Sequence, residues 1–268
     1  MSAAAERELL AGRYRLGELL GSGGAGEVRR AWDTTFNRPV AVKIVRWDAG
    51  GATRRRFRHE VRTLAGLQHP GVVSVLDAGT DGSRSFVVMR LVDGGTLRDR
   101  MAVGAMDVDT VRELGAHIAE ALDHVHARGI VHRDITPANI LLDDRGRPHL
   151  ADFGLARLPD SPQLTKTGHV MGTAAYLAPE QVRGQDITTA TDIYALGLVL
   201  LECLTGHREF PGGRAEAAAA RLHRPPHLPA DLPDDLTRLL GRMTSLVPHR
   251  RPTAADCAHT LRYRDLRA

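Results

Sequence analysis

The chain has 268 residues, with 36 lysines and arginines against 32 aspartates and glutamates, which gives a net charge of +4 at pH 7. This length is enough for two modest domains or one large one with a sizeable core. The small basic excess is weak evidence for nucleic-acid binding, and the densest basic run, residues 54–58, is typical of one solvated helix face. We therefore expect no nucleic-acid partner.

The cysteines and the apolar runs exclude further classes. Cys203 and Cys257 lie far apart without C-x-x-C spacing, so neither a disulfide framework nor a zinc site is predicted. Residues 1–8 lack the basic and apolar regions of a secretory signal. The longest mainly apolar run, residues 193–204, is too short to cross a bilayer and predicts a buried helix. We expect a cytoplasmic chain without a membrane segment.

Three alternating segments, residues 14–20, 28–32 and 40–46, predict an antiparallel meander. The first turn reads G-S-G-G-A-G-E-V and fits the pattern G-x-G-x-x-G-x-V at Gly21, Gly23, Gly26 and Val28. Glycines let backbone N–H groups close over phosphates, which side chains would obstruct. Dinucleotide-binding folds use similar glycines, but there the last glycine opens a helix, whereas Gly26 opens a strand. The turn is therefore predicted to hold nucleotide phosphates.

Lys43 lies on the third of these strands, in the sequence V-A-V-K. A buried lysine is costly unless it is paired with an anion. The segment 53–67 supplies one, because its apolar residues recur at helical spacing and Glu60 lies beside them on the same face. We expect an ion pair between Lys43 and Glu60. Residues 72–77 and 85–91 add two strands, which completes a five-stranded sheet.

A linker, R-L-V-D-G-G-T-L, separates this sheet from a helical region. A stripe of apolar residues predicts a helix at residues 111–125, with Asp107 or Asp109 as its N-cap and Gly129 just beyond its end.

Beyond the buried helix at residues 193–204, two closing surface helices are predicted at residues 236–243 and 254–266. Residues 208–233 are rich in proline, arginine and histidine, and we expect them to be irregular.

The chain is organised around residues 130–154, which read I-V-H-R-D-I-T-P-A-N-I-L-L-D-D-R-G-R-P-H-L-A-D-F-G. The oxygen-bearing side chains Asp134, Asn139 and Asp152 fall on two loops, joined by apolar runs that predict a short β-hairpin. Asp134 is then placed to meet a substrate hydroxyl, while Asn139 and Asp152 coordinate a hard cation. Mg²⁺ fits, because it takes oxygen ligands from one or two protein groups and fills its other positions with water and phosphate. Mn²⁺ is the alternative.

His-Arg-Asp followed by Asn139, and then Asp-Phe-Gly, is a pattern typical of protein kinases. With the glycine turn and Lys43 upstream, the chain resembles the eukaryotic-like serine/threonine protein kinases of bacteria. The resemblance implies an α+β, two-lobed protein-kinase fold at residues 14–264. A small antiparallel β lobe with one helix would occupy residues 14–91, and a larger, mainly α-helical lobe residues 92–264. Residues 1–13 and 265–268 would be an extension and a tail.

By this resemblance, ATP and Mg²⁺ lie between the lobes, and Asp134 accepts the proton of a serine or threonine hydroxyl on a protein substrate. Lys43, paired with Glu60, would hold the α- and β-phosphates. The other residues implied around the nucleotide are Leu20, Val28 and Ala41 above the adenine, Leu141 below it, Met89 at the back of its pocket, backbone groups of Arg90 and Val92 at its edge, and Asp93 near the ribose.

Residues 155–171 and the following G-T-A-A-Y-L-A-P-E resemble an activation segment. Thr165 and Thr167 are then the expected autophosphorylation sites, with Arg133 as a cationic partner and a transient homodimer as the reacting pair. Thr173 would line the site of the substrate hydroxyl.

The same resemblance implies two structural ties. Asp192 would hold the backbone of the loop that carries Asp134, and Glu180 would pair with Arg251.

Two alternatives remain. Thr136 stands where these kinases usually carry a lysine that meets the γ-phosphate, which is the one support for a pseudokinase or weakly active nucleotide-binding scaffold. The intact Lys43, Asp134 and Asp152 argue against it. A small-molecule kinase of the aminoglycoside type would share the ATP machinery, but the segment ending in A-P-E is typical of a docking surface for a peptide.

Overall fold

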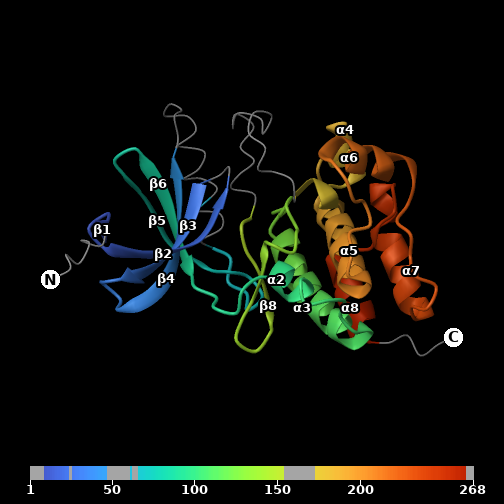
Figure 1. Ribbon diagram of the computed structural model, residues 1–268, viewed down its shortest axis with the longest axis horizontal. Helices are drawn as coiled ribbons and strands as arrows, with labels where there is room; N and C mark the ends of the chain where they lie inside the picture. The colour runs from blue at the N-terminus through green and yellow to red at the C-terminus, as the bar shows by residue number, and fades with distance from the viewer. Residues whose placement is uncertain (1–8, 24–25, 47–60, 62–65, 154–172, 264–268) are drawn as a thin grey trace. The chain divides into compact units, whose positions relative to one another are not determined.

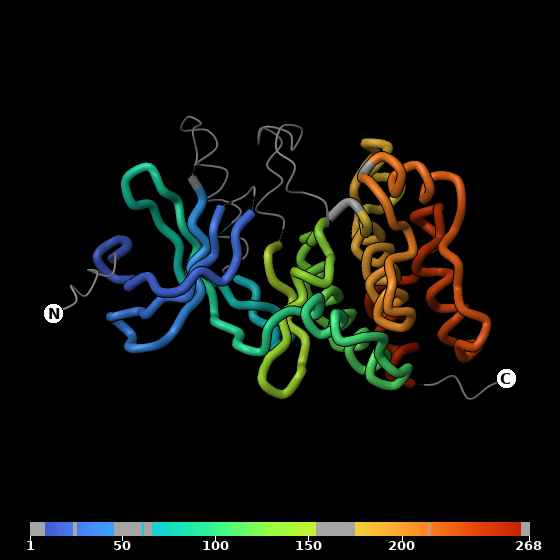
Figure 2. The backbone as a smooth tube through the Cα atoms, viewed as in Figure 1, coloured from blue at the N-terminus to red at the C-terminus, as the bar shows by residue number. Residues whose placement is uncertain are grey.

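The computed structural model describes residues 9–23, 26–46, 61, 66–153 and 173–263 (Figures 1 and 2). These residues form two compact units. The first, here called the sheet unit, contains the described residues up to 69 and residues 73–92. The second, here called the helical unit, contains residues 70–72 and the described residues from 93 onward.

The sheet unit holds one antiparallel sheet of six strands in the order β1-β2-β3-β4-β6-β5. The strands are β1 (Leu9–Leu10), β2 (Tyr14–Gly23), β3 (Gly26–Asp33), β4 (Arg38–Arg46), β5 (Val75–Asp81) and β6 (Arg84–Arg90). The sheet has one strand more than predicted, because Leu9 and Leu10 pair with Arg15 and Tyr14. Leu10 is fully buried, so residues expected only to precede the domain contribute to its core.

β5 is displaced from its predicted position at residues 72–77. Val72 instead bridges to Leu150 in the helical unit, and the strand continues to Asp81. Two residues, Gly82 and Ser83, separate β5 from β6, and Gly82 has a φ of +59°. A two-residue hairpin loop needs such a left-handed residue, which is why glycine occupies it.

The core of the sheet unit lies on one face of the sheet. Successive residues of a strand point to opposite faces of the sheet, and the buried set on this face is apolar: Leu10, Tyr14, Leu16, Ala31, Val40, Val42, Ile44, Phe86 and Val88. The intervening residues Ala41 and Lys43 therefore point to the opposite face.

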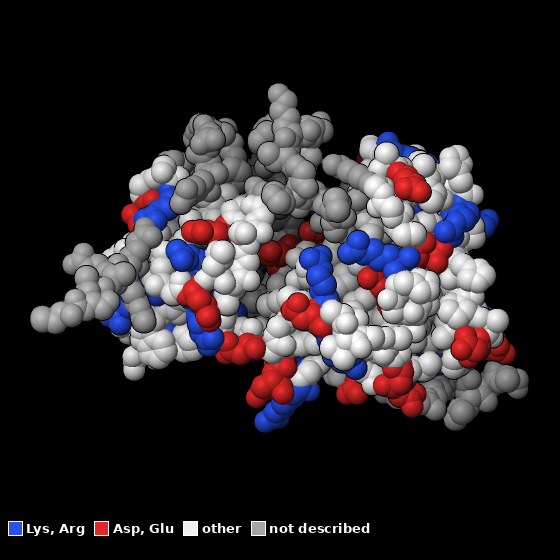
Figure 3. All heavy atoms as spheres, viewed as in Figure 1, with Lys and Arg blue, Asp and Glu red and all other residues white. Residues whose placement is uncertain are grey.

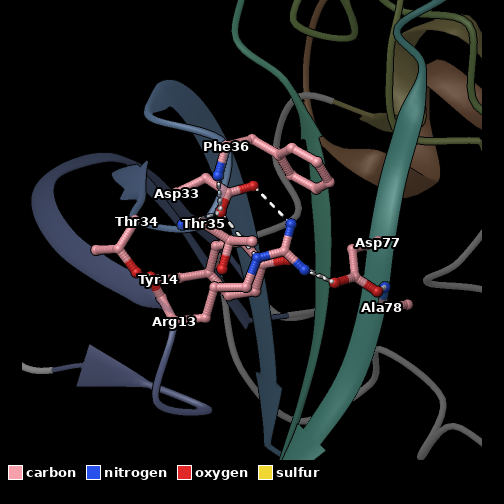
Figure 4. A network of polar contacts seen from close by, with 8 residues as sticks. All are labelled: Arg13, Tyr14, Asp33, Thr34, Thr35, Phe36, Asp77 and Ala78. Atoms are coloured by element: carbon pink, nitrogen blue, oxygen red, sulfur yellow. Dashed lines mark hydrogen bonds and ion pairs between the residues drawn. The ribbon is translucent and has the colours of Figure 1, made fainter.

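A polar network joins strands from the two ends of the sheet (Figure 4). The guanidinium of Arg13 donates to both carboxylate oxygens of Asp33, at 2.8 and 2.7 Å, and to Oδ2 of Asp77 at 2.9 Å. The Tyr14 hydroxyl also donates to Asp77. Hydrogen bonding from Arg13 holds the pKa of Asp33 at about 2, although burial alone would raise it. The network thus ties β5 to the β2 and β3 side of the sheet.

The helical unit contains seven described α-helices, two 3₁₀ turns and a small hairpin. These elements are α2 (Leu97–Met101), α3 (Val108–His126), β7 (Ile140–Leu142), β8 (Pro148–Leu150), η1 (Thr173–Tyr176), α4 (Pro179–Arg183), α5 (Thr189–Thr205), α6 (Arg214–His223), α7 (Asp234–Met243), η2 (Pro248–Arg250) and α8 (Ala254–Arg262). α3 packs on α5 and α8. α5 contains the predicted apolar run and is buried along most of its length, as expected.

α3 begins as predicted, because Oδ1 of Asp107 accepts a hydrogen bond from the Thr110 N–H at 2.9 Å. Gly129 follows the helix with a φ of +71°. The expectation that residues 208–233 are irregular is wrong, because α6 lies within them. Its run of alanines has the highest helix propensity, and it outweighs the proline-rich flanks.

α8 ends at Arg262, earlier than predicted. None of the described helices is both long and apolar enough to cross a membrane. On the face seen in Figure 3, basic and acidic residues are interspersed over the described surface.

Candidate active site

A hairpin brings together the two loops that carry the predicted acidic and amide side chains. β7 and β8 pair in antiparallel register, with Ile140 opposite Leu150. Beyond this pair, the Ala151 N–H donates to the Asn139 carbonyl at 2.9 Å. Asn139 therefore precedes the hairpin and Asp152 follows it at the same end, which confirms the predicted hairpin.

Asn139 binds Asp134 directly. Its Nδ2 donates to the Asp134 carbonyl at 2.8 Å and to the Oδ2 carboxylate oxygen at 2.9 Å. Because both amide hydrogens are engaged there, Oδ1 of Asn139 is left as an acceptor for another group. Oδ1 of Asp134 is buried from solvent and has no hydrogen-bond partner within the described part of the chain. Asp134 thus has one oxygen that is fixed and one that can accept a proton donor.

Arg133 and Asp152 both have left-handed backbones, with φ values of +69° and +58°. Non-glycine residues in this region cost about 1–3 kcal/mol each, so surrounding contacts must hold them. Oδ1 of Asp192 accepts from the Arg133 N–H at 2.7 Å, and its Oδ2 accepts from the His132 N–H at 2.8 Å. On the other side, Nε2 of Gln181 donates to the Arg133 carbonyl at 3.1 Å. Asp192 therefore ties down the loop as expected.

Sequence reasoning missed two residues that support this loop. His126, in the last turn of α3, donates from Nε2 to Oδ2 of Asp192 at 2.8 Å. Gln181 lies in α4 and was not singled out. Neither could be found from a local motif, because each acts on a partner more than 40 residues away, as the separations of 66 and 48 residues show.

The His132 ring contacts both the loop that carries Asp134 and the loop that carries Asp152. Its Nε2 lies 2.9 Å from the Ala151 carbonyl and its Nδ1 lies 3.3 Å from the Asp134 N–H. A carbonyl can only accept and an N–H can only donate, so these partners place the imidazole proton on Nε2. The ring is fully buried. It therefore fixes the residue before Asp152 relative to Asp134.

Asp134 and Thr136 line a narrow, closely packed hollow together with Tyr176, Leu177 and Gln181. Thr136 is only 3% exposed. The hollow lies entirely within the helical unit, and the segment that follows η1 forms one of its walls.

The predicted pair of Glu180 and Arg251 is present, with Glu180 in the first turn of α4, directly after this segment. Arg251 donates to the two Glu180 oxygens at 2.7 and 2.9 Å. The Thr191 hydroxyl also donates to Glu180, at 2.9 Å, and Arg251 reaches the carbonyls of Ser245 and Ala190. Burial is the largest single influence and raises the pKa of Glu180, but the hydrogen bonds and charge of Arg251, together with hydrogen bonds from the backbone and Thr191, outweigh burial and lower this pKa. The pair is buried and fully hydrogen-bonded.

Four of the predicted nucleotide residues of the sheet unit share the sheet face opposite the core. Lys43 pairs with Val28 in β3, and Ala41 pairs with Met89 in β6. Residues that pair directly lie on the same face, and so do alternate residues of one strand. Val28, Ala41, Lys43 and Met89 therefore lie on one face, and Lys43 is only 6% exposed. Glu60, its predicted partner, lies outside the described residues.

The glycine turn joins β2 to β3. Gly21 pairs with Val28 and Gly23 with Gly26. A Cβ atom at Gly26, where φ is +126°, would lie 2.0 Å from the Ile44 carbonyl oxygen, so no other residue fits there. Leu20 lies at an irregularity of β2 and is 48% exposed.

The remaining predicted residues fall in several places. The Arg90 N–H donates to the Ser74 carbonyl at 2.9 Å, so it is already engaged. Val92 is half-buried and Asp93 exposed, Leu141 lies in the middle of β7, and Thr173 begins η1. Thr165 and Thr167 lie outside the described residues.

Comparison with known proteins identifies the family of this chain. The sequence matches the family described as "Protein kinase domain" over residues 14–261. It is 42% identical over 271 residues to the DNA damage-responsive serine/threonine-protein kinase RqkA of Deinococcus radiodurans, covering 96% of this chain. It is 40% identical over 241 residues to serine/threonine-protein kinase PknA of Mycobacterium tuberculosis, covering 86% of this chain. It is 37% identical over 261 residues to serine/threonine-protein kinase PrkC of Bacillus subtilis, covering 92%.

The aligned regions amount to 41%, 56% and 40% of these three relatives, so the chain spans about half of their length or less. The match nevertheless covers nearly all of this chain, from the start of β2 to the last turn of α8. The two-lobed fold expected from the motifs is confirmed. The chain belongs to the protein kinase family, and its relatives are named as serine/threonine protein kinases of bacteria.

Proposed function

We propose that the chain is an ATP-dependent serine/threonine protein kinase, which transfers the γ-phosphate of ATP to hydroxyl groups of protein substrates. The observation that carries this proposal is the arrangement at Asp134. One oxygen of its carboxylate is held by Asn139, and the other is buried and unpartnered within the described part of the chain.

Asp134 would act as the base. An unpartnered carboxylate oxygen is the group that a substrate hydroxyl can meet, donating its hydrogen bond and then its proton as the oxygen attacks the γ-phosphate. The bond from Asn139 fixes the carboxylate, and Asp192 fixes the backbone before it. Positioning of this kind is the main protein contribution to phosphoryl transfer, since little covalent chemistry falls to the protein.

Asn139 and Asp152 would hold the divalent cation. The amide hydrogens of Asn139 are used on Asp134, so its Oδ1 can serve as a ligand, and Asp152 supplies carboxylate oxygens. This donor set suits Mg²⁺, which keeps several waters and binds few protein groups, and Mn²⁺ accepts the same ligands. The bound cation would neutralise charge on the β- and γ-phosphates.

The nucleotide itself would meet residues of the sheet unit. Lys43 would hold the α- and β-phosphates with Glu60 as its partner, under the N–H groups of the glycine turn. Val28, Ala41 and Met89, which lie on the same face as Lys43, would contact the adenine with Leu20 and Leu141. Because the Arg90 N–H is engaged by Ser74, Arg90 would meet the adenine edge through its carbonyl. The N–H of Val92 and the side chain of Asp93 would complete the site.

A protein substrate is favoured over a small molecule because the segment that forms the wall of the hollow is anchored to the rest of the helical unit. The anchor is the buried pair of Glu180 and Arg251, which are joined by two hydrogen bonds. A wall beside Asp134 that is anchored in this way suits a peptide, and Thr173 would contribute to the site of the hydroxyl. The same wall is the feature that disfavours an aminoglycoside-type kinase.

Regulation would follow from Arg133, an exposed residue that directly precedes Asp134 in the sequence. Phosphate on Thr165 or Thr167 would supply its anion, and a transient homodimer would carry out the modification. The expected compartment is the cytosol, where the buried free thiols of Cys203 and Cys257 stay reduced.

The test is transfer from γ-labelled ATP with Mg²⁺, using the protein alone, with a basic protein such as histone, and with an aminoglycoside. The proposal predicts label on protein serine or threonine, detected by phosphoamino-acid analysis. Label on the aminoglycoside would instead support the small-molecule alternative. Nucleotide binding without any transfer would support the pseudokinase.

A further inference from the structure

α6 carries an arginine that the chemistry so far does not use. Arg221 is 0% exposed, although it lies on a helix whose neighbours are mostly half-buried or exposed. Its Nε donates to the Ala217 carbonyl one turn earlier, at 2.8 Å. Its Nη1 donates to the carbonyl of Leu177, which lies outside α6. A buried side chain of α6 is therefore bonded to the segment between η1 and α4.

The groups around Arg221 show how its buried positive charge is stabilised. No carboxylate within the described chain pairs with it, and its Nη2 has no hydrogen-bond partner there. Its guanidinium carbon lies 5.3 Å from the centre of the Phe210 ring, a cation–π distance. A buried cation without a counterion is costly, so the two carbonyls and this ring are its main compensation.

Leu177 is a wall residue of the hollow that also contains Asp134 and Thr136. It follows Tyr176, the last residue of η1, and precedes Ala178, the N-cap of α4. Arg221 thus reaches, through a single carbonyl, the wall that faces the proposed base. Removal of that bond would free the wall without touching Asp134, Asn139 or Asp152.

We infer that Arg221 is a positioning residue for the protein substrate: by holding the Leu177 carbonyl, it fixes the wall against which the peptide next to the target hydroxyl binds. The inference rests on the proposed kinase function. It assigns to α6 a part in substrate affinity, and none in the binding of ATP.

The test compares the variants R221M, R221K and R224M with the unaltered protein. Methionine keeps the length of the side chain but cannot donate, and lysine keeps the charge. Arg224 is a matched control, because it contacts the same Phe210 ring at 4.9 Å and pairs with Glu209, but makes no bond to Leu177. The measurements are KM for a protein substrate, KM for ATP, and the melting temperature.

We expect R221M to raise KM for the protein substrate about tenfold, the order expected for one bond from a charged donor. KM for ATP should change less than twofold, R221K should show a smaller rise, and R224M should match the unaltered protein. The melting temperature of R221M should hold, since replacing a buried charge with an apolar residue removes a desolvation cost.

The inference would be overturned by an unchanged KM for the protein substrate in R221M, or by equal rises in both KM values together with a lowered melting temperature. An R224M variant that behaves like R221M would do the same, because packing on Phe210 would then be the cause. If R221M does not fold, the same comparison of KM for the protein substrate with KM for ATP is made on R221K. Failure of the function itself is distinct, because the unaltered protein would then transfer no phosphate.

Discussion

Thr136 is the residue whose effect on rate is easiest to isolate. It is buried at the edge of the hollow beside Asp134, at the position where the resemblance leads us to expect a lysine. A cation there would act mainly on charge that develops on the transferring phosphoryl group, so it would stabilise the transition state more than bound ATP.

We therefore expect T136K to raise kcat about tenfold, which corresponds to about 1.4 kcal/mol, while KM for ATP changes little. Steady-state kinetics with varied ATP measures both. T136M is the control for the added bulk, since it lengthens the side chain without a charge. An unchanged kcat in T136K would mean that another basic residue already fills this role.

At this scale the sequence indicated candidate site residues but not their backbone conformations. His-Arg-Asp and Asp-Phe-Gly marked the loops, but the left-handed φ values of Arg133 and Asp152 could not be predicted. They depend on partners remote in sequence, such as Asp192, which lies 59 residues from Arg133. Local sequence favours ordinary turns for these residues.

Between elements, the pair of Glu180 and Arg251 makes a prediction about stability. Its side chains are 3% and 0% exposed. Removing one partner of such a pair leaves the other charge buried, which costs about 3–5 kcal/mol. E180Q should lower the free energy of unfolding by this amount, measured by urea denaturation at pH 7. E120Q is a surface control, because Glu120 and Arg262 are both more than a third exposed and E120Q should cost about 1 kcal/mol or less.

The same pair predicts a pH dependence. The folded state lowers the pKa of Glu180, so its contribution is fully present above the ordinary glutamate pKa of about 4.3. It is lost as the pH falls through the lowered value. The difference in unfolding free energy between the unaltered protein and E180Q should therefore shrink below about pH 4. A difference that stays constant from pH 7 to pH 3 would contradict this assignment.

Elements with a strong periodic pattern were predicted well, and the exceptions have identifiable causes. α3, α5 and α7 lie where their apolar stripes indicated. α6 was missed because six residues of high helix propensity are flanked by prolines, and β1 because a two-residue strand carries no periodicity. Arg221 could not be predicted as a buried contact without α6. Its role depends on a carbonyl 44 residues away.

For the whole molecule, the order of the motifs was enough to predict the family, which the comparison over residues 14–261 confirms. Glu60, Thr165 and Thr167 lie outside the described residues, so their roles stay predictions. The resemblance, and not the geometry, supplies them.

One of these predictions concerns regulation. Arg133 is exposed and directly precedes Asp134 in the sequence, so its guanidinium suits a phosphothreonine, which brings about −1.5 to −2 charge. Incubation with ATP and Mg²⁺ should place phosphate on Thr165, Thr167 or both, as seen by mass spectrometry. T165A/T167A should then be slower than the unaltered protein, and T173A should lose activity while keeping these phosphates. Full activity of T165A/T167A, with no phosphate at residues 155–171 of the unaltered protein, would end this idea.

The central claim is that one loop carries the base and the other the metal ligand, and a comparison of D134N with D152A tests it most directly. Mg²⁺-dependent ATP binding is measured by calorimetry and phosphate transfer by labelling, with circular dichroism as the check on folding. D134N should bind ATP as the unaltered protein does but transfer phosphate at least about 100-fold more slowly, the usual contribution of a general base. D152A should lose transfer and also bind ATP more weakly in Mg²⁺. Near-normal transfer by D134N, or unchanged Mg²⁺-dependent binding by D152A, would contradict the account.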